Sequence, residues 1–469
     1  MRVPYAKGLQ LYTKSPLWMQ NFLGFLTKPI PRSSLYGSGF NSFFQMLSKT
    51  QWYKPEPLKK IQENNLRSLI KHAYQNVPYY HKVFKKRKLR PDDIKTIEDL
   101  RKLPILSKDD VRKNFTQLVA VNSKNFNYGF NTTHGTTGKP LTFCLDQQNR
   151  EKEYATQWRQ LQWAGIDFSA KIATFRGNFV YTHGKTKAIS KFNALSKELD
   201  FNSYNMNENL LLHYIKKLKN FQPDLIKGYP SVLQTMSKFM LNNNIKYSPK
   251  VIQTSSETLF QNDREFIEKA FECKIYDWYG QSEYVVSAGQ CPEGNYHINV
   301  ESGIMEFIKD DENVSPDELG EILGTGFFNY SMPFIRYKIG DVGRYSSDLC
   351  ACGRALPLLQ SLEGRINDLI ITPDNKTISG LAFHHYWRRR INPYLPNVED
   401  VHIIQKSKRK LLIELVKKEG YLDKETHIIL KELKMLLGSQ MEIEFKDVDP
   451  MQIGNKRRFT ESELNANLG

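Results

Sequence analysis

Between about Pro91 and Glu363, the sequence alternates short apolar runs with amphipathic segments of helical period. Two of the amphipathic segments are Glu208 to Asn220 and Asn262 to Phe271, in which apolar residues recur every three or four positions, as on one face of a helix. Strands that alternate with helices along a chain form layers in which helices cover a mainly parallel sheet. We therefore predict an α/β fold for this part of the chain.

The length of the chain, 469 residues, predicts more than one domain. We expect an N-terminal helical region over 1–90 that packs on the large domain, a core domain over 91–363, and a smaller α+β domain over 364–469. The elements expected in the last part are strands at Val398–Gln405 and Lys410–Val416, a helix at Lys424–Leu437 and a final strand at Met441–Phe445.

The stretch from Thr132 to Pro140 concentrates glycines, hydroxyl residues and a lysine. Its two glycines remove side chains from a turn around which hydroxyl and ammonium groups offer donors, as a polyphosphate requires. It is not a Walker loop, because Pro140 stands where the magnesium-binding hydroxyl should be, and an ordinary hairpin turn is the alternative. In either case we expect a strand to follow at Leu141–Leu145. The candidate phosphate-binding residues are Thr133, His134, Gly135, Thr136, Thr137, Gly138 and Lys139.

Three further segments follow this loop along the chain: Asp277 to Glu283, Phe334 to Asp341, and Glu363 to Ile370. Together with the loop, and in the same order, they resemble the motifs of adenylate-forming enzymes, the superfamily of acyl-CoA synthetases, luciferases and peptide-synthetase adenylation domains. His72 to Tyr80 and Gly228 to Ser231 resemble the phenylacetate–CoA ligase branch, particularly its CapK-type members, which are linked with capsular polysaccharide biosynthesis.

The resemblance implies a large multi-layer α/β domain that carries the ATP site and a small, mobile α+β lid. It also implies ATP-dependent adenylation of a small carboxylic acid or amino acid, followed by transfer of the acyl group to CoA, a carrier thiol or a glycan. The expected cofactors are ATP and Mg²⁺, with CoA as one acceptor, and the expected setting is capsular or cell-surface polysaccharide synthesis. The alternative is a nucleotide-binding scaffold without turnover, because Asn367 replaces the usual hinge aspartate and the late lysine, Lys456, is displaced from its usual place.

Two of the implied catalytic residues act on the phosphates. Lys139, with Thr136 and Thr137, would contact the β- and γ-phosphates, and Glu283 would coordinate a bridging Mg²⁺. A glutamate at this position could instead cap a helix, which is the alternative for Glu283.

The third implied catalytic residue, Lys456, resembles the late lysine that links the attacking carboxylate to the α-phosphate. Asn455 is inserted before it, relative to the usual Gly-Lys pattern, so Arg457 or Arg458 could serve instead. A solvated basic tail is the remaining alternative.

The nucleoside is assigned to several turns. Asp341 would bind the ribose hydroxyls, although an aspartate after glycine could instead bond its own backbone, and Tyr279 would stack on the base. Arg365 is assigned to the ribose or phosphate side. The nucleotide-binding residues that the resemblance implies are Ser256, Glu257, Thr258, Asp277, Trp278, Tyr279, Gly280, Asp341 and Arg365.

Three of the five cysteines and one histidine stand in two short turns. Cys291 and His297 flank a Pro/Gly turn, and Cys350 and Cys352 lie in a second turn. Three thiolates and one imidazole form a closed tetrahedral set that suits structural Zn²⁺ and leaves no position for a catalytic water. Free buried cysteines are the alternative.

The acyl pocket has weaker candidates. Arg176, Tyr181, Tyr229 and Trp278 stand in segments that could border it, and such side chains suit an aromatic or hydroxylated acid better than a long fatty acid. For each residue alone, an ordinary core or surface position is the alternative.

The formal net charge is +17, but the basic residues come without a nucleic-acid-binding signature, so we expect no nucleic-acid partner. No apolar run approaches the ~20 residues of a membrane span, and Trp18–Leu26 is short and interrupted by polar residues. We expect a cytoplasmic protein. A homodimer and a peripheral association with polysaccharide machinery remain open.

Overall fold

The computed structural model describes residues 31–133, 140–176, 180–182, 186–193, 196–202, 206–365, 368–374, 377–378, 380–449 and 459–464. Contacts within the chain divide it into two units. Unit 1 comprises residues 1–305, 324–338 and 347–358, and unit 2 comprises residues 306–323, 339–346 and 359–469. The limits expected from the sequence, 1–90, 91–363 and 364–469, rest on a different criterion and stay predictions.

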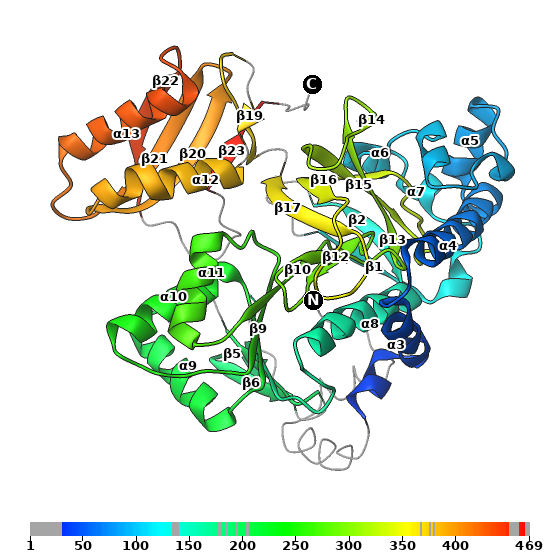
Figure 1. The fold of residues 1–469 in the computed structure, drawn as a ribbon, viewed down its shortest axis with the longest axis horizontal. Coiled ribbons are helices and arrows are strands. Elements are labelled where there is room, and N and C mark those ends of the chain that lie inside the picture. Colours follow the sequence, from blue (N-terminus) through cyan, green and yellow to red (C-terminus); the bar gives the residue numbers. More distant parts are fainter. Residues whose placement is uncertain are drawn as a thin grey trace. The chain divides into compact units, whose positions relative to one another are not determined.

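Helices make up much of unit 1, and Figure 1 labels them. They are α3 (Ser38–Thr50), α4 (Pro55–Asn76), α5 (Pro78–Lys86), α6 (Lys108–Lys113), α7 (Phe115–Leu118), α8 (Gln147–Trp163), α9 (Glu208–Phe221), α10 (Pro230–Asn242) and α11 (Gln261–Phe271). Proline at the first position starts α4, α5 and α10, because its φ suits a helix and its missing N–H would have no partner there. Asn207 caps α9 by accepting a hydrogen bond from the Leu210 N–H.

Some strands lie wholly in unit 1, and others have residues in both units. Those of unit 1 are β1 (Tyr128–Thr132), β2 (Thr142–Asp146), β3 (Ile172–Phe175), β4 (Val180–Thr182), β5 (Thr186–Ala188), β6 (Ser190–Asn193), β7 (Glu198–Phe201), β8 (Leu225–Gly228), β9 (Val251–Ser255), β10 (Ile275–Gly280), β11 (Ser287–Gln290) and β12 (Tyr296–Ile298). The strands with residues in both units are β13 (Gly303–Lys309), β15 (Gly320–Gly326), β16 (Tyr337–Ser346) and β17 (Leu358–Arg365).

Five strands of unit 1 lie parallel in the order β7-β3-β8-β9-β10. Helices α9, α10 and α11 connect successive strands from β7 to β10, and their apolar sides pack together on one face of the sheet (Figure 1). That face contributes Phe175, Phe201, Ile226 and Ile252, none more than 1% exposed. Helices thus cover a mainly parallel sheet, and the predicted α/β class is confirmed.

The opposite face of this sheet is apolar at Ile172 and Leu225 and becomes polar toward the carboxyl ends of the strands. The parallel register pairs Thr174 with Lys227 and Lys227 with Gln253, so these three side chains lie side by side on it. Gln160 of α8 covers the row: it accepts a hydrogen bond of 2.7 Å from Gln253 and donates one of 2.7 Å to the main-chain carbonyl of Asp277. Both faces of a parallel sheet are normally apolar, so a polar face calls for a reason other than packing.

A buried ion pair joins α8 to the segment before β13. Arg159 Nη1 lies 2.6 Å from Glu301 Oε1, and both side chains are fully buried. Arg159 Nη2 also donates to Asn299 Oδ1 at 2.6 Å, and the Thr50 hydroxyl of α3 donates to Glu301 at 2.6 Å. These hydrogen bonds offset part of the cost of removing both charges from water.

Unit 2 ends in a two-layer α+β arrangement. Its C-terminal sheet has the order β22-β21-β20-β23, and α12 and α13 pack on the same apolar face of it (Figure 1). The elements of unit 2 are β14 (Glu312–Asn313), β18 (Ile370–Ile371), β19 (Thr377–Ile378), α12 (Gly380–Tyr386), β20 (Val398–Ser407), β21 (Lys410–Lys417), α13 (Asp423–Leu437), β22 (Glu442–Asp447) and β23 (Thr460–Ser462).

Four predicted C-terminal elements are confirmed as β20, β21, α13 and β22. The expectation that β22 is the final strand is wrong. β23 follows it and pairs parallel with β20, with Thr460 opposite Ile403. Three residues are too few for a hydrophobic period to appear, and pairing with β20 stabilises this strand instead.

Two of the predicted helices lie in unit 1 and can be compared with the structure. The helices predicted at Glu208–Asn220 and Asn262–Phe271 are confirmed as α9 and α11. The segment Trp18–Leu26 lies outside the described residues. Across the described ranges, no helix combines the length and the apolar character that crossing a membrane requires.

The buried ion pair predicts that replacing its arginine lowers the stability of unit 1 much more than replacing a lysine of an exposed ion pair. Arg159→Met leaves the Glu301 carboxylate buried without its cation, and we expect the free energy of unfolding of unit 1 to fall by about 3–5 kcal/mol. Lys59→Met breaks the pair with Glu98, whose side chain is 62% exposed, and should cost less than about 1 kcal/mol. Chemical denaturation followed by tryptophan fluorescence measures both, and equal losses would contradict the prediction.

Candidate functional site

Four polar turns meet at one edge of the parallel sheet. Arg176 follows β3, Tyr229 follows β8, Ser256 follows β9 and Gln281 follows β10. Because these strands pair in parallel, all four turns leave the sheet at its carboxyl edge. In open α/β sheets, ligands bind outside the carboxyl ends of the strands. The sheet thus brings together the turn at Ser256 and the segment that ends at Glu283, which are far apart in sequence.

The turn Ser256-Glu257-Thr258 is held in an uncommon conformation. Ser256 has a φ of +73°, in the left-handed region that costs a residue with a Cβ on the order of 1–2 kcal/mol. The Glu257 carboxylate accepts hydrogen bonds from the Ser231 N–H at 3.0 Å and from the Ser231 hydroxyl at 3.1 Å. It thereby joins the turn after β9 to the first turn of α10, where the helix dipole favours a carboxylate. The contact of this turn with adenine stays a prediction.

The side chains of Asp277 and Trp278 in β10 have partners inside unit 1. The Asp277 carboxylate accepts hydrogen bonds from the hydroxyls of Thr254 and Tyr296, and burial raises its pKa. The Trp278 indole bonds to Glu153 of α8, and burial raises the pKa of Glu153 to about 7. Both side chains hold β10 in place, and their roles in nucleotide binding stay predictions. The residues that end β10 at the carboxyl edge are Tyr279 and Gly280.

Glu283 is 5% exposed and is held by one phenol. The Tyr337 hydroxyl donates to Glu283 Oε1 at 2.7 Å, and the fully buried Tyr337 ring stacks on Phe334 with a centroid distance of 4.7 Å. Within the described residues no hydrogen bond engages Glu283 Oε2. A carboxylate with one oxygen oriented and the other available fits a monodentate Mg²⁺ ligand. The alternative of a helix cap is not supported, because β11 follows β10 with no helix between them.

Tyr337 is a positioning residue that sequence reasoning missed. It stands in the segment Phe334 to Asp341 that carries the resemblance, but its role depends on Glu283, which precedes it by more than fifty positions. Nothing in the sequence links the two residues. Only the pairing of distant strands brings them together.

Unit 2 holds the two predicted nucleotide-binding residues of the later motifs. Arg365 Nε lies 3.5 Å from Asp341 Oδ1, and the Asp341 side chain is 15% exposed. The main-chain N–H of Arg365 donates to Asp368 Oδ2 at 2.9 Å. The structure therefore brings Asp341 and Arg365 together, and their contact with ribose stays a prediction.

The strands on either side of the predicted phosphate loop form a hairpin. β1 and β2 pair antiparallel up to Thr132 and Thr142, which confirms the strand predicted after Pro140. The Thr133 hydroxyl accepts a hydrogen bond of 3.0 Å from the Leu141 N–H and so closes the described part of the turn. The predicted residues that lie outside the described ranges are His134, Gly135, Thr136, Thr137, Gly138, Lys139, Asn367 and Lys456.

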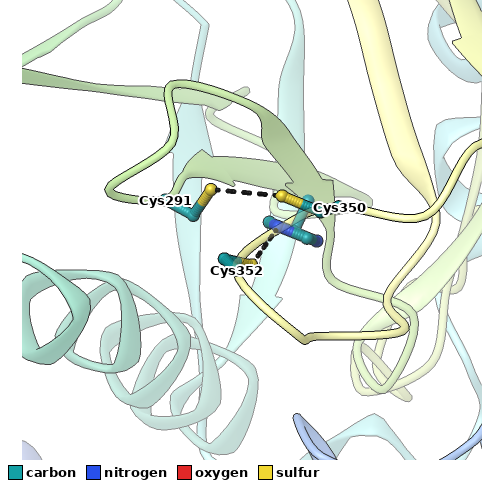
Figure 2. A group of neighbouring side chains, drawn as sticks. Cys291, Cys350 and Cys352 are labelled. Atoms are coloured by element: carbon teal, nitrogen blue, oxygen red, sulfur yellow. Dashed lines mark hydrogen bonds between the residues drawn. The ribbon is translucent and has the colours of Figure 1, made fainter.

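The four predicted metal ligands converge in unit 1, and Figure 2 labels the three cysteines among them. The ligand atoms of Cys291, His297, Cys350 and Cys352 all lie within 4.8 Å of one another. Cys291 Sγ is 3.7 Å from Cys350 Sγ, and Cys352 Sγ is 3.2 Å from His297 Nε2. Cys291 and His297 flank a turn that contains Gly294 with a φ of +84°. Cys350 and Cys352 lie in a turn that contains Gly353 with a φ of +81°. Three sulfurs and one nitrogen at this spacing could hold one tetrahedral cation.

The protonation of His297 suits such a cation. Burial lowers the pKa of His297 to about 4, so its ring is neutral near pH 7. Nδ1 lies 3.1 Å from the carbonyl oxygen of Leu356, a pure acceptor, so the proton belongs on Nδ1 and the lone pair on Nε2. That lone pair points to the side of Cys352. A backbone carbonyl that orients a ligating imidazole in this way is typical of metal sites.

Comparisons with known proteins were made by sequence and by structure. Residues 370–461 match the family model described as the CapK C-terminal domain. Protein CapK of Staphylococcus aureus is 26% identical over 460 residues, which cover 96% of this chain and 98% of that protein. The phenylacetate–coenzyme A ligase of Escherichia coli (strain K12) is 26% identical over 328 residues, 67% of this chain and 73% of the relative.

Among solved structures, a 2-hydroxyisobutyryl-CoA ligase in the postadenylation state superposes with a TM-score of 0.67 at 17% identity and covers 88% of this chain and 91% of its own. The fold is therefore that of an adenylate-forming ligase: a large α/β part followed by a C-terminal domain. The comparisons confirm the predicted resemblance to the adenylate-forming superfamily, its phenylacetate–CoA ligase branch and CapK-type proteins.

The hydrogen bond between Tyr337 and Glu283 predicts a stability difference that needs no ligand. Tyr337→Phe keeps the ring and removes the donor to a buried carboxylate, so we expect a loss of about 1.5–3 kcal/mol in the free energy of unfolding. Tyr345→Phe removes a 3.1 Å bond to the neutral carbonyl of Val314 and should cost about 1 kcal/mol. Urea denaturation compares the two variants. A smaller loss for Tyr337→Phe than for Tyr345→Phe would show that Tyr337 does not anchor Glu283.

Proposed function

We propose that this chain adenylates a small carboxylic acid with ATP and then transfers the acyl group to CoA or another acceptor, in the synthesis of capsular or cell-surface polysaccharide. The observation that carries the proposal is that the turns after β8, β9 and β10, which belong to segments that carry the resemblance, leave the sheet at one edge, and that Tyr337 orients Glu283 after β10. The polysaccharide setting is supported by the likeness to protein CapK along 96% of the chain. The acceptor CoA is supported by the likeness to phenylacetate–coenzyme A ligases.

In the first proposed step, a carboxylate oxygen of the acid attacks the α-phosphorus of ATP, and the bond to the bridging oxygen breaks. The products are the acyl-adenylate and pyrophosphate, so atoms and charge balance. Negative charge accumulates on the phosphate oxygens in the transition state, and positive charge held nearby stabilises it. Thr136, Thr137 and Lys139 would contact the departing phosphates, and Lys456 would neutralise charge between the carboxylate and the α-phosphate.

Glu283 would hold Mg²⁺ through the oxygen that Tyr337 leaves available. The ion supplies positive charge at the bridging phosphate oxygens when it is bound. The Asp341 carboxylate offers two acceptor oxygens to the ribose hydroxyls, and Arg365 would hold it in the orientation this requires. Tyr279 would stack on the base at the end of β10.

In the second step, a nucleophile attacks the acyl carbon and AMP leaves. A thiol, as in CoA or a carrier, or an amine or hydroxyl of a glycan would serve. Because ATP is consumed, we expect the reaction in the cytoplasm. Homodimer formation and a peripheral association with polysaccharide machinery stay predictions.

The cysteine cluster is a separate part of the proposal: it would hold a structural Zn²⁺. Four ligand atoms within 4.8 Å of one another, and a neutral imidazole oriented by a carbonyl, support this ion. Burial raises the pKa of the Cys291 thiol to about 12, so the thiolate that a metal requires is stable there only beside a cation. The ion would fasten the turn of Cys291 to the turn of Cys350.

The first test of the proposed function is ATP–pyrophosphate exchange with pools of aryl acids, amino acids, hydroxy acids and uronic acids. We expect exchange with one pool, and a decrease of about 10–100-fold or more in Glu283→Gln and Asp341→Asn, because each removes a charged ligand. Asp311→Asn, in an exposed turn, is the matched control and should leave the rate unchanged. ATP binding without exchange in any pool would contradict adenylation and favour a nucleotide-binding scaffold.

Metal analysis tests the zinc site. Protein produced with added zinc should contain about one zinc ion per chain, and Cys350→Ser should lose most of it, because one of four ligands is gone. Cys273→Ser, which changes a cysteine outside the cluster, should keep the metal. A chelator should also lower the thermal midpoint of the unsubstituted protein. Zinc-free protein, or a Cys350→Ser variant that keeps its zinc, would overturn the assignment.

A further inference from the structure

The polar face of the parallel sheet becomes charged toward its carboxyl edge. Lys227 of β8 lies beside Thr174 of β3, and Thr174 lies beside Asp200 of β7. Arg176 directly follows β3 and lies close enough to Lys227 for the two cations to repel each other. The region between this face and α8 therefore contains a lysine and an arginine within a fold layer that is normally apolar.

Lys227 is attracted by Glu198 and Asp200 but forms no ion pair with either carboxylate. Its side chain keeps some accessible surface, yet burial lowers its pKa to about 8, with repulsion from Arg176 and Arg32 adding to the effect of burial and attraction by Glu198 opposing it. Its Nζ lies 5.9 Å from the centre of the Trp158 ring of α8. Lys227 is therefore largely removed from water and faces the aromatic ring of Trp158.

Two guanidinium groups share this region. The Arg176 Nε is buried without a hydrogen-bond partner in the described part of the chain, and the same holds for Arg32 Nε and Nη1. Arg32 is 5% exposed, and its Cζ lies 5.6 Å from the Trp158 ring centre. Buried N–H groups without an acceptor are costly, so an acceptor is expected at this place.

Glu198 attracts both Lys227 and Arg176, but it is one carboxylate beside three cations, the third being Arg32. Burial raises the pKa of Asp200 to about 7, with repulsion from Glu198 adding to it, and the pKa of Glu153 is also raised to about 7. Both are therefore partly protonated near neutral pH. Among the described residues, no carboxylate lies within ion-pair distance of Lys227 or Arg176. The region thus has an excess of positive charge that an anion would neutralise.

This charged region borders the proposed reaction site. Arg176 is close enough to Tyr284, the residue after Glu283, for the two to interact electrostatically. The Tyr229 N–H, which follows β8, donates to the carbonyl of Phe175 at 3.2 Å and so brings the ends of β8 and β3 together. An acid whose reacting carboxylate lies near Glu283 could therefore extend toward Lys227.

We propose that the acid that this chain activates carries a second anionic group, a carboxylate, which Lys227 and Arg176 bind between the parallel sheet and α8. This inference rests on the proposed adenylation, because it concerns the acyl part of the same site. Arg176 can offer two parallel N–H groups to a carboxylate, and Lys227 adds a point charge. A hydroxylated monocarboxylic acid would accept hydrogen bonds but would leave both charges unpaired.

Calorimetric binding tests the inference without turnover. The probes are succinate, glutarate, adipate and phthalate, each compared with its monocarboxylate, butyrate, valerate, hexanoate or benzoate, and with glucuronate as a hydroxylated monocarboxylate. We expect at least one dicarboxylate to bind about tenfold more tightly than its monocarboxylate, and Lys227→Met and Arg176→Gln each to weaken that binding by about tenfold or more. Lys227→Arg should retain it, which separates loss of charge from misfolding. Lys246→Met, at an exposed position, is the control.

Exchange assays with the same acids separate the two proposals. A dicarboxylate that binds in a Lys227-dependent way and supports exchange agrees with both. The same binding without exchange for any acid contradicts adenylation but supports the anion site. Exchange with monocarboxylates that Lys227→Met leaves unchanged supports adenylation and overturns the inference. The inference is also overturned if no dicarboxylate in the panel binds.

Discussion

The parallel pairing of β3, β8, β9 and β10 is the constraint on which the rest of unit 1 depends. Parallel strands need crossover connections, and here these are helices that cover one face with a continuous apolar core. The same pairing places four turns from distant parts of the sequence at one edge. Each turn can then carry a polar residue without disturbing the core, because its side chain lies beyond the last hydrogen-bonded pair of the sheet.

On the other face of this sheet, buried polar side chains need hydrogen-bond or ion-pair partners. α8 brings polar side chains against it, and Gln160 satisfies Gln253 and a carbonyl of β10 directly. Deeper in unit 1, Arg159 and Glu301 neutralise each other. Lys227 lies on the same sheet face as Gln253 but lacks such a partner among the described residues. Gln160, Gln253, Arg159 and Glu301 satisfy one another within the fold, whereas Lys227 fits the proposed role of binding an anionic group of the substrate.

Much of the fold was predictable because its signals are local. The helical period predicted the limits of α9, α11 and α13 to within one or two residues, and apolar runs predicted β20 and β21. The short β23 escaped detection because pairing with β20, not its own sequence, makes it a strand. Lys227 stands within Leu225 to Gly228, a run otherwise typical of a buried parallel strand. A lysine at such a position could have been recognised from the sequence as a candidate functional residue. A charge in such a run needs a reason.

The sequence predicted the cysteine cluster and the motif residues of the candidate site, but not the contact between Tyr337 and Glu283. The candidate metal ligands could be recognised from residue type and from their place in two turns, and the structure brings their ligand atoms within 4.8 Å of one another. Motif residues such as Asp277 and Glu257 were expected to meet the nucleotide, yet their carboxylates hold neighbouring strands and turns. A motif records every residue that a site needs, including those that position others. Tyr337 shows the converse, because its contact with Glu283 depends on long-range pairing that no local pattern reports.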